Sequence, residues 1–178
     1  MNGASHAIVG GTLGLAIGGP MGMVLGAAGS LLPDIDHPGS TISRIIFPKE
    51  THNHAGRVLV GAALVAVATF VKSHYLLWVG IGVLALAFIP HRGVLHTPAF
   101  LLLLGSAYYI FGDNSTLIAC LLLGYGSHIL MDSFTTDGAP LLWPIHGKKW
   151  GIRLIKTGST GEYLIVGLVL IMAYFLLG

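Results

Sequence analysis

The chain has 178 residues, of which 54% are hydrophobic and only 9% are charged, whereas a soluble domain carries roughly a quarter charged residues. This composition excludes an ordinary soluble domain and indicates an integral membrane protein, which we predict to be one membrane-embedded domain over residues 1–178. The net charge of +2 is too small, and the basic residues are too scattered, to indicate nucleic-acid binding, and the lone Cys120 excludes an intramolecular disulfide.

The first apolar segment, Ala4 to Leu32, is rich in glycine and is interrupted by Gly18-Gly19-Pro20. As one helix it would cross the bilayer. As two halves of about 12 residues, each would rise roughly 18 Å, about half of the hydrocarbon core. Proline lacks an N–H group and glycine tolerates turn dihedrals, which favours the second interpretation. We therefore predict a re-entrant helical hairpin that returns His6 to the side of Asp34.

The remaining apolar segments predict about five spanning helices, the first two of them somewhat short for a span of about 20 residues. They are, in chain order, Val58 to Val71, Tyr75 to Pro90, a helix ending at Phe111, Thr116 to Met131, and Glu162 to Leu177. The first two predict a tight hairpin after a polar loop at residues 39–56, and Ser115 is a predicted N-cap. The predicted fold class is all-α and polytopic, with about five transmembrane helices plus the N-terminal re-entrant hairpin.

The loop charges predict the orientation. Eight basic residues fall in the loops at 39–57, 91–96 and 133–161, against Lys72 alone on the opposite side. By the positive-inside rule these loops are cytoplasmic. We predict a multi-pass protein of the inner (plasma) membrane whose candidate site residues all lie on the cytoplasmic face, given the hairpin.

Two carboxylates and an imidazole occur together in Asp34-x-Asp36-His37, at the end of the first apolar run. Oxygen and nitrogen donors of this kind suit zinc or manganese. The alternative is a helix-terminal turn whose aspartates cap neighbouring N–H groups. Because ionisable groups near hydrocarbon are costly, we favour metal ligands.

His128 and Asp132 are four residues apart near the end of a predicted helix, so both side chains share one face and can reach the same ion. The alternative is an ordinary ion pair.

A second pair, His91 and His96, accompanies Arg92, whose planar guanidinium suits phosphate. Arg92 could instead anchor the chain at the membrane interface.

Glu162 opens the last helix, where it could cap the helix dipole or reach the site as a base. His6 joins the site only if the hairpin forms. His52 and His54 are rivals of His91 and His96, because they follow the aspartate cluster more closely in the sequence.

These motifs together resemble the YdjM-like family of inner-membrane metal-dependent hydrolases, some members of which are described as LexA-regulated or LexA-binding. The resemblance covers most of the chain and rests on His6, Leu31 to Pro38, His91-Arg92-Gly93 with His96, Gly124 to Asp132, Thr136, Gly138, Pro140 to Pro144, and Glu162. It implies a hydrolase. The His-x-x-x-Asp pair is also similar to one in zinc-dependent phospholipase C and related nucleases, which points to phosphoester substrates.

We therefore predict a metal-dependent hydrolase that acts on a phosphoester of a lipid or lipid-linked substrate. The predicted metal ligands for zinc, or for manganese, are His6, Asp34, Asp36, His37, His91, His96, His128 and Asp132. They exceed the four that one zinc accepts, so either two ions bind or some ligands have a supporting role. Arg92 would bind a phosphate oxygen, and Glu162 or Asp36 would act as base.

Two other functions stay open: a metal or proton transporter, and a non-catalytic membrane protein stabilised by metal. The predicted partners are membrane lipid and no nucleic acid. The sequence leaves the substrate, the oligomeric state and a LexA partner undetermined.

Overall fold

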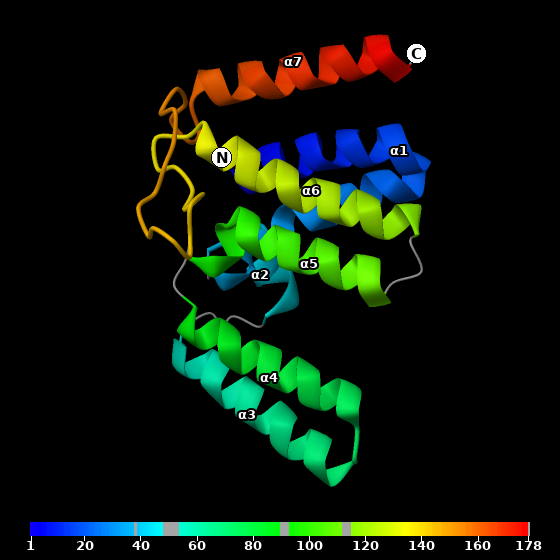
Figure 1. Cartoon of the computed structure of the whole chain (residues 1–178), viewed down its shortest axis with the longest axis vertical. Coiled ribbons are helices and arrows are strands. Elements are labelled where there is room, and N and C mark those ends of the chain that lie inside the picture. The colour runs from blue at the N-terminus through cyan, green and yellow to red at the C-terminus, as the bar shows by residue number, and fades with distance from the viewer. Residues whose placement is uncertain (38, 48–53, 90–92, 112–114, 178) are drawn as a thin grey trace. The chain divides into compact units, whose positions relative to one another are not determined.

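The computed structural model is all-helical and divides into two compact units, Met1–Pro33 with Arg92–Gly178, and Asp34–His91 (Figure 1). It describes residues 1–178 except 38, 48–53, 90–92, 112–114 and 178. Within this part of the chain, bridged extended backbone is limited to two isolated pairs in the loop at 134–159. The all-α prediction is confirmed, while the single membrane-embedded domain stays a prediction.

The first unit begins with α1 (Gly3–Leu31), which is two helices folded back on each other at Gly19. Gly19 has φ 62° and ψ −153°, a conformation open to glycine, and Pro20 then starts the second half, where its missing N–H is not needed. A Cβ atom on Gly14 would overlap the carbonyl group of Gly22 in the opposite half. The predicted helical hairpin is therefore present, and its re-entrant position in a membrane stays a prediction.

Helix α6 (Thr116–Ser133) packs closely on the second half of α1 (Figure 1). A Cβ atom on Gly124 would overlap the carbonyl group of Gly26. Small residues at such contacts allow helix backbones to approach closely, as in many membrane proteins. The predicted N-cap of α6 is confirmed, because the Ser115 hydroxyl accepts a hydrogen bond from the Ile118 N–H at 3.3 Å.

Three further elements complete the first unit: η3 (Val94–His96), α5 (Pro98–Phe111) and α7 (Thr160–Leu177). The hydroxyl of Tyr125 on α6 donates to the carbonyl of Leu95 at 2.5 Å and so fixes η3 against α6. Val166 of α7 packs in one apolar cluster with residues of α1 and α6. The same end of the unit therefore gathers the start of α1, the end of α6 and the start of α7.

The second unit contains η1 (Leu32–Asp36), which begins in the first unit, and then α2 (Thr41–Ile46), α3 (His54–Phe70) and α4 (His74–Phe88). Helices α3 and α4 form the predicted tight hairpin. Glycine again permits close packing: a Cβ on Gly80 of α4 would lie 2.9 Å from the backbone nitrogen of Val65 of α3.

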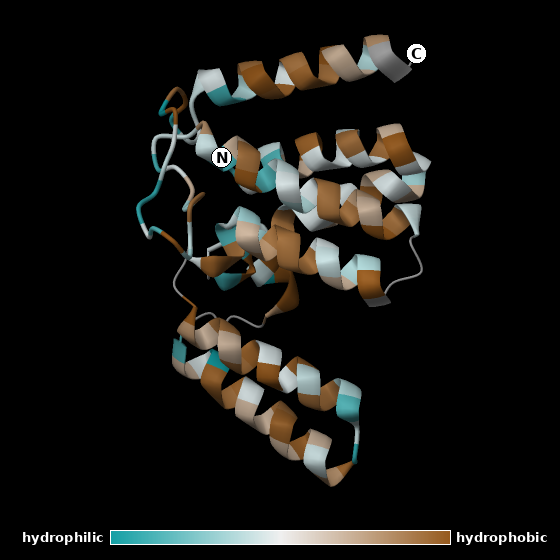
Figure 2. Cartoon of the chain, in the orientation of Figure 1, coloured by the Kyte–Doolittle hydropathy of each residue, from teal (hydrophilic) through white to brown (hydrophobic). Residues whose placement is uncertain are grey.

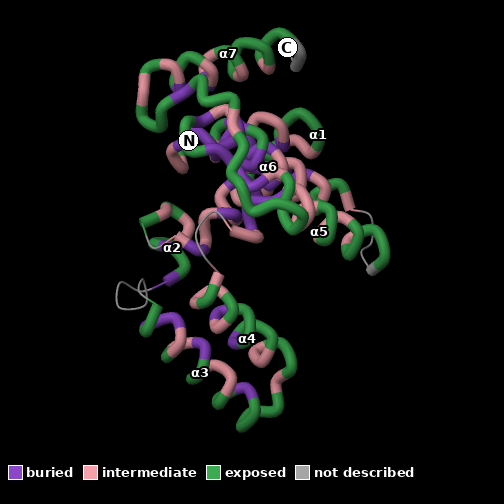
Figure 3. Tube along the Cα trace, turned by 60° about the vertical axis from the view of Figure 1, so that its left-hand side comes forward, coloured by how far each residue is buried: buried purple, intermediate pink, exposed green. Residues whose placement is uncertain are grey.

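The distribution of side chains is the reverse of that in a soluble protein. The largest fully buried side chains include His6, His96, His128 and Glu162, whereas large apolar side chains such as Phe70 and Phe175 are exposed. Figure 2 shows apolar residues along the outer faces of the helices, and Figure 3 shows that buried residues concentrate where α1 and α6 meet. This arrangement suits a lipid solvent, in which apolar surface costs nothing and polar groups must be satisfied internally.

The number of spans is not confirmed. Among the described residues, two segments, Gly3–Asp36 and Thr116–Ser133, are long and apolar enough to cross a membrane, and the first of them contains the fold at Gly19. Helix α3, with 17 residues, rises roughly 25 Å, less than a hydrocarbon core of roughly 30 Å. Apart from α6, the five-span prediction therefore rests on helices that are individually short.

The hairpin contact generates a first prediction. Gly14→Ala should lower the thermal stability in detergent, because the new methyl group must separate the two halves of α1, at a cost of about 2 kcal/mol. Gly105→Ala on α5 is the matched control, since its Cβ would meet nothing within 4 Å. Equal melting temperatures for the two variants would contradict the observed packing.

Candidate metal centre

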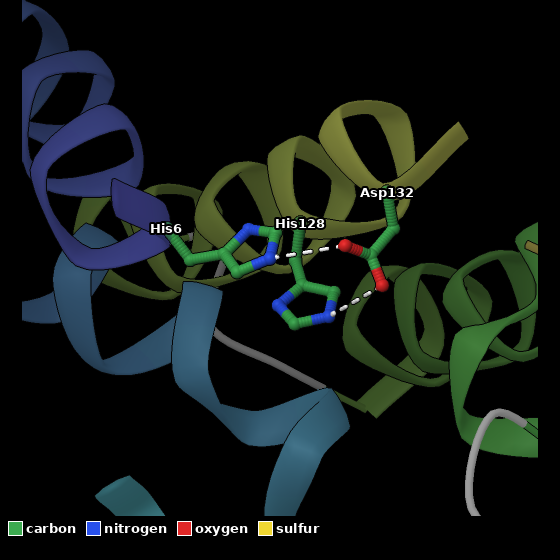
Figure 4. Close-up of side chains that lie close together, drawn as sticks. All are labelled: His6, His128 and Asp132. Carbon is green, nitrogen blue, oxygen red and sulfur yellow. Dashed lines mark hydrogen bonds and ion pairs between the residues drawn. The ribbon is translucent and has the colours of Figure 1, made fainter. Parts of the chain in front are cut away.

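Three side chains from two helices converge in the first unit (Figure 4). His6 projects from the start of α1 toward Asp132 of α6, and its Nε2 lies 3.2 Å from Asp132 Oδ1. His128 Nε2 lies 3.7 Å from Asp132 Oδ2. All three residues are at most 1% exposed. We call His6, His128 and Asp132 the buried triad.

The helix geometry explains the convergence. His128 and Asp132 are one turn apart on α6 and share a face, as their spacing predicts. The fold at Gly19 lets both halves of α1 lie along α6, and His6 stacks on His128 with ring centroids 3.8 Å apart and an interplanar angle of 16°. One atom from each residue can be chosen so that all three lie within 4.8 Å of one another.

A backbone contact fixes the tautomer of His128. Its Nδ1 lies 2.7 Å from the carbonyl oxygen of Ser30, which can only accept a hydrogen bond, so Nδ1 carries the proton. In the neutral ring, Nε2 then presents its lone pair toward Asp132. Metal-bound histidines are commonly oriented in this way by a carbonyl behind them. Sequence reasoning could not identify the role of Ser30, because a backbone oxygen is present at every position.

His6 carries a buried nitrogen, Nδ1, with no hydrogen-bond partner. A buried polar atom of this kind calls for an explanation, and a bound ion or water is one that the chemistry allows. Two imidazole nitrogens and one carboxylate oxygen are also a donor set that divalent metals accept. The residues present therefore fit a metal ion held by His6, His128 and Asp132.

Glu162 lies fully buried at the start of α7, and both of its oxygens accept backbone hydrogen bonds. Oε1 accepts from the Asn2 N–H at 2.8 Å and Oε2 from the Gly158 N–H at 2.7 Å. Glu162 thus fastens the start of α1, which carries His6, to the start of α7. The amino group of Met1 lies 2.6 Å from Asp132 Oδ1, so a positive charge also faces the triad.

His96 is also fully buried, and its ring centroid is 5.1 Å from that of His128, so η3 brings a third histidine beside the triad. Of the other predicted residues, Asp34, Asp36 and His37 belong to the second unit, and His91 and Arg92 lie outside the described residues. Their roles stay predictions.

Of the two rival histidines, His52 lies outside the described residues. His54 is the first residue of α3, and its Nδ1–H donates to the carbonyl oxygen of Ala87 at 2.7 Å.

The expectation of a polar loop throughout residues 39–56 is wrong at α2 and at the start of α3, because both are helical. Short helical turns there are capped and packed, as the Ser40 cap of α2 illustrates.

Arg57 is buried, although the sequence analysis grouped it with the basic loop residues. Its Nη1 donates to the carbonyls of Asp36 at 2.7 Å and Leu86 at 3.3 Å, and its Nη2 donates to the carbonyl of Ile35 at 3.3 Å and the hydroxyl of Ser43 at 3.4 Å. Arg57 therefore holds the turn of the Asp34-x-Asp36-His37 motif within the second unit. Sequence reasoning missed it because charge alone does not distinguish a buried arginine from a loop arginine.

Replacing Arg57 should therefore unfold the second unit more easily. We expect Arg57→Ala to lower stability by about 3 kcal/mol, because it leaves several buried carbonyl oxygens without their donor. Arg44→Ala, at an exposed position of α2, is the control and should change little. Limited proteolysis in the region of α2 and α3 measures the difference. An equal effect of both variants would refute the role of Arg57 in holding this turn.

Glu162→Gln should loosen the start of α1. Glutamine is neutral and offers only one acceptor oxygen, so one of the two N–H groups loses its acceptor, which should reduce hydrogen-exchange protection there by about tenfold. Asp137→Asn, at an exposed position, is the control. Hydrogen–deuterium exchange followed by mass spectrometry measures residues 1–10. Unchanged protection in Glu162→Gln would show that the carboxylate is not what fastens α1.

Comparison with known proteins places this geometry in a family. The protein is 27% identical over 151 residues to the uncharacterized protein YvsG of Bacillus subtilis (strain 168), an alignment that covers 84% of this chain and 74% of that protein. No solved structure matches. The model of the YdjM inner membrane protein family matches residues 1–178, the whole chain with the buried triad included, and the protein therefore belongs to the YdjM inner membrane protein family.

Proposed function

We propose that this protein is a membrane-bound, metal-dependent hydrolase that acts at the cytoplasmic membrane surface on a phosphoester of a lipid or lipid-linked substrate. The observation that carries the proposal is the buried triad: two imidazoles and a carboxylate, from residues up to 126 positions apart, meet in an apolar setting. Burying such groups is costly unless they are paired or bind an ion, and in membrane proteins they mark functional sites.

Zinc is the metal we propose, with manganese as the alternative, because the nitrogen and oxygen donors suit both. Three protein ligands are the usual number in catalytic zinc sites, in which a fourth position is left for reactants. When bound, the ion would supply Lewis-acid polarisation of a phosphoryl oxygen. The hydrogen bond from His128 to the carbonyl of Ser30 would keep the imidazole oriented toward the ion.

The charge around this end of the first unit supports an anionic substrate. The loop at 134–159 leaves α6 just after Asp132 and enters α7 just before Glu162, and it carries the exposed side chains of Lys148, Lys149 and Lys156. Clustered positive charge attracts phosphate-bearing molecules to a site. We propose that Arg92 binds a phosphate oxygen and that Asp36 or Glu162 acts as base, as the sequence motifs predict.

Complete burial of the triad favours one second candidate, a metal site that only stabilises the helix packing. In that case all coordination positions would be filled by the protein, and no substrate could reach the ion. Metal content alone does not separate the two candidates, whereas turnover of a phosphoester does.

The proposal predicts stoichiometric zinc or manganese in detergent-purified protein, with loss of the metal in His6→Ala and His128→Ala, which each remove one ligand. His146→Ala, at an exposed position, should keep the metal. Asp34→Ala tests the sequence-predicted part of the site. Elemental analysis of the well-folded variants measures the content.

The outcomes separate the candidates. Metal together with release of phosphate from a phosphatidic acid or a polyprenyl phosphate supports the hydrolase, whereas metal without any turnover favours the structural site. A folded wild type that takes up no metal when zinc and manganese are resupplied would overturn both.

A further inference from the structure

The loop between α6 and α7 is folded against the end of α6 (Figure 1). The Ile152 N–H donates to the carbonyl of Ser133, the last residue of α6, at 2.8 Å. Ala139 and Trp150 exchange two backbone hydrogen bonds of 2.8 Å each. The two arms of the loop are therefore fastened to each other and to the last turn of α6.

These hydrogen bonds determine the level of the loop relative to a membrane. Helix α6 is long and apolar enough to cross a membrane, and it ends at Ser133. Because Ile152 is bonded to Ser133, the middle of the loop stays where α6 ends. In a bilayer that α6 crosses, this level is the headgroup region, just outside a hydrocarbon core of roughly 30 Å.

The loop exposes large apolar side chains at this level. Ile145 is 91% exposed, Leu154 71% and Ile152 61%. Trp143 and Trp150 are also exposed. In water this much exposed apolar surface on an ordered loop is unfavourable. Tryptophan and aliphatic side chains are instead stabilised among lipid headgroups.

The same loop carries charge of one sign. Between residues 138 and 161 the chain has four basic residues and no acidic residue. The basic side chains are all exposed: Lys148, Lys149, Arg153 and Lys156. The Nζ atom of Lys148 lies 5.8 Å from the ring centroid of Trp150, so a cation and an aromatic ring are presented together. Anionic phospholipids offer phosphate groups to such cations.

The backbone at Arg153 is unusual for its residue type. Arg153 has φ 57°, a left-handed conformation that glycine adopts more easily. The hydrogen bonds from the Ile152 and Leu154 N–H groups to the end of α6 hold it there. The chain thus keeps an arginine where the backbone alone favours glycine, which indicates a role for its side chain.

We propose that the loop at residues 141–156 is a docking surface for anionic phospholipid headgroups of the adjoining leaflet. Its apolar side chains insert among the headgroups, and its four cations bind their phosphates. An acidic protein would match the cations equally well, but the exposed apolar side chains at the level of the headgroups favour lipid. This inference is independent of the proposed metal chemistry, because it depends on the loop alone.

The test uses the full chain in vesicles of equal parts phosphatidylcholine and phosphatidylglycerol, in which either one lipid or the other carries bromine, a quencher of tryptophan fluorescence. Trp78→Phe, at an exposed position of α4, leaves Trp143 and Trp150 of the loop as the only fluorophores. In this parent protein we expect brominated phosphatidylglycerol to quench more strongly than brominated phosphatidylcholine, with a preference of about tenfold in relative association constant.

Three variants of the parent protein separate charge from folding. Lys148→Gln combined with Lys149→Gln should lower the preference at least fivefold. Arg153→Gly should also lower it, about fivefold, while its melting temperature in detergent does not fall, because glycine adopts the observed φ without strain. Lys72→Gln, an exposed cation in the turn between α3 and α4, is the control and should keep the preference.

The remaining outcomes are distinct from those of the metal proposal. His6→Ala should keep the preference for phosphatidylglycerol, whatever happens to its metal content. Equal quenching by the two brominated lipids overturns the inference, as does a preference that survives in the double lysine variant. Weak quenching by both lipids overturns it as well and leaves an acidic protein as the occupant. A preference that is lost in sodium phosphate, but kept in sodium chloride of the same ionic strength, shows that the loop binds free phosphate and contradicts a lipid site.

Discussion

Direct backbone contact between glycines is the constraint on which the rest of the first unit depends. Gly14 meets Gly22 within α1, and Gly26 meets Gly124 between α1 and α6, in each case with no space for a side chain. Because these contacts set how closely the helices approach, they also set the distance between His6 and Asp132. A wider separation would leave the imidazoles and the carboxylate buried apart from one another, which costs far more than the packing itself.

Buried polar side chains of the first unit are hydrogen-bonded or ion-paired with groups around the triad. Asp132 faces two imidazoles and an amino group, His128 is held from behind by Ser30, and Glu162 accepts two backbone N–H groups. These surrounding contacts fix the orientation of the triad side chains, which is what a metal site requires of its surroundings. The apolar surface outside this network suits a lipid environment.

The sequence predicted those features that depend on local chemistry. Gly19 and Pro20 determine the fold of α1, and the four-residue spacing of His128 and Asp132 determines their common face. It could not predict the carbonyl of Ser30 or the burial of Arg57, because both arise from tertiary contacts that no residue type announces. The number of spans was not confirmed for a related reason, since apolar composition alone does not determine how far a short helix crosses a bilayer.

The separation of His6 and Asp132 along the chain has a consequence for biogenesis. The hairpin of α1 is made of contacts close in sequence and can fold as soon as it has been synthesised. Asp132 follows His6 by 126 residues, so the buried triad is incomplete until α6 has been synthesised. An ion held by the triad would therefore be bound late, after α6 has packed on α1.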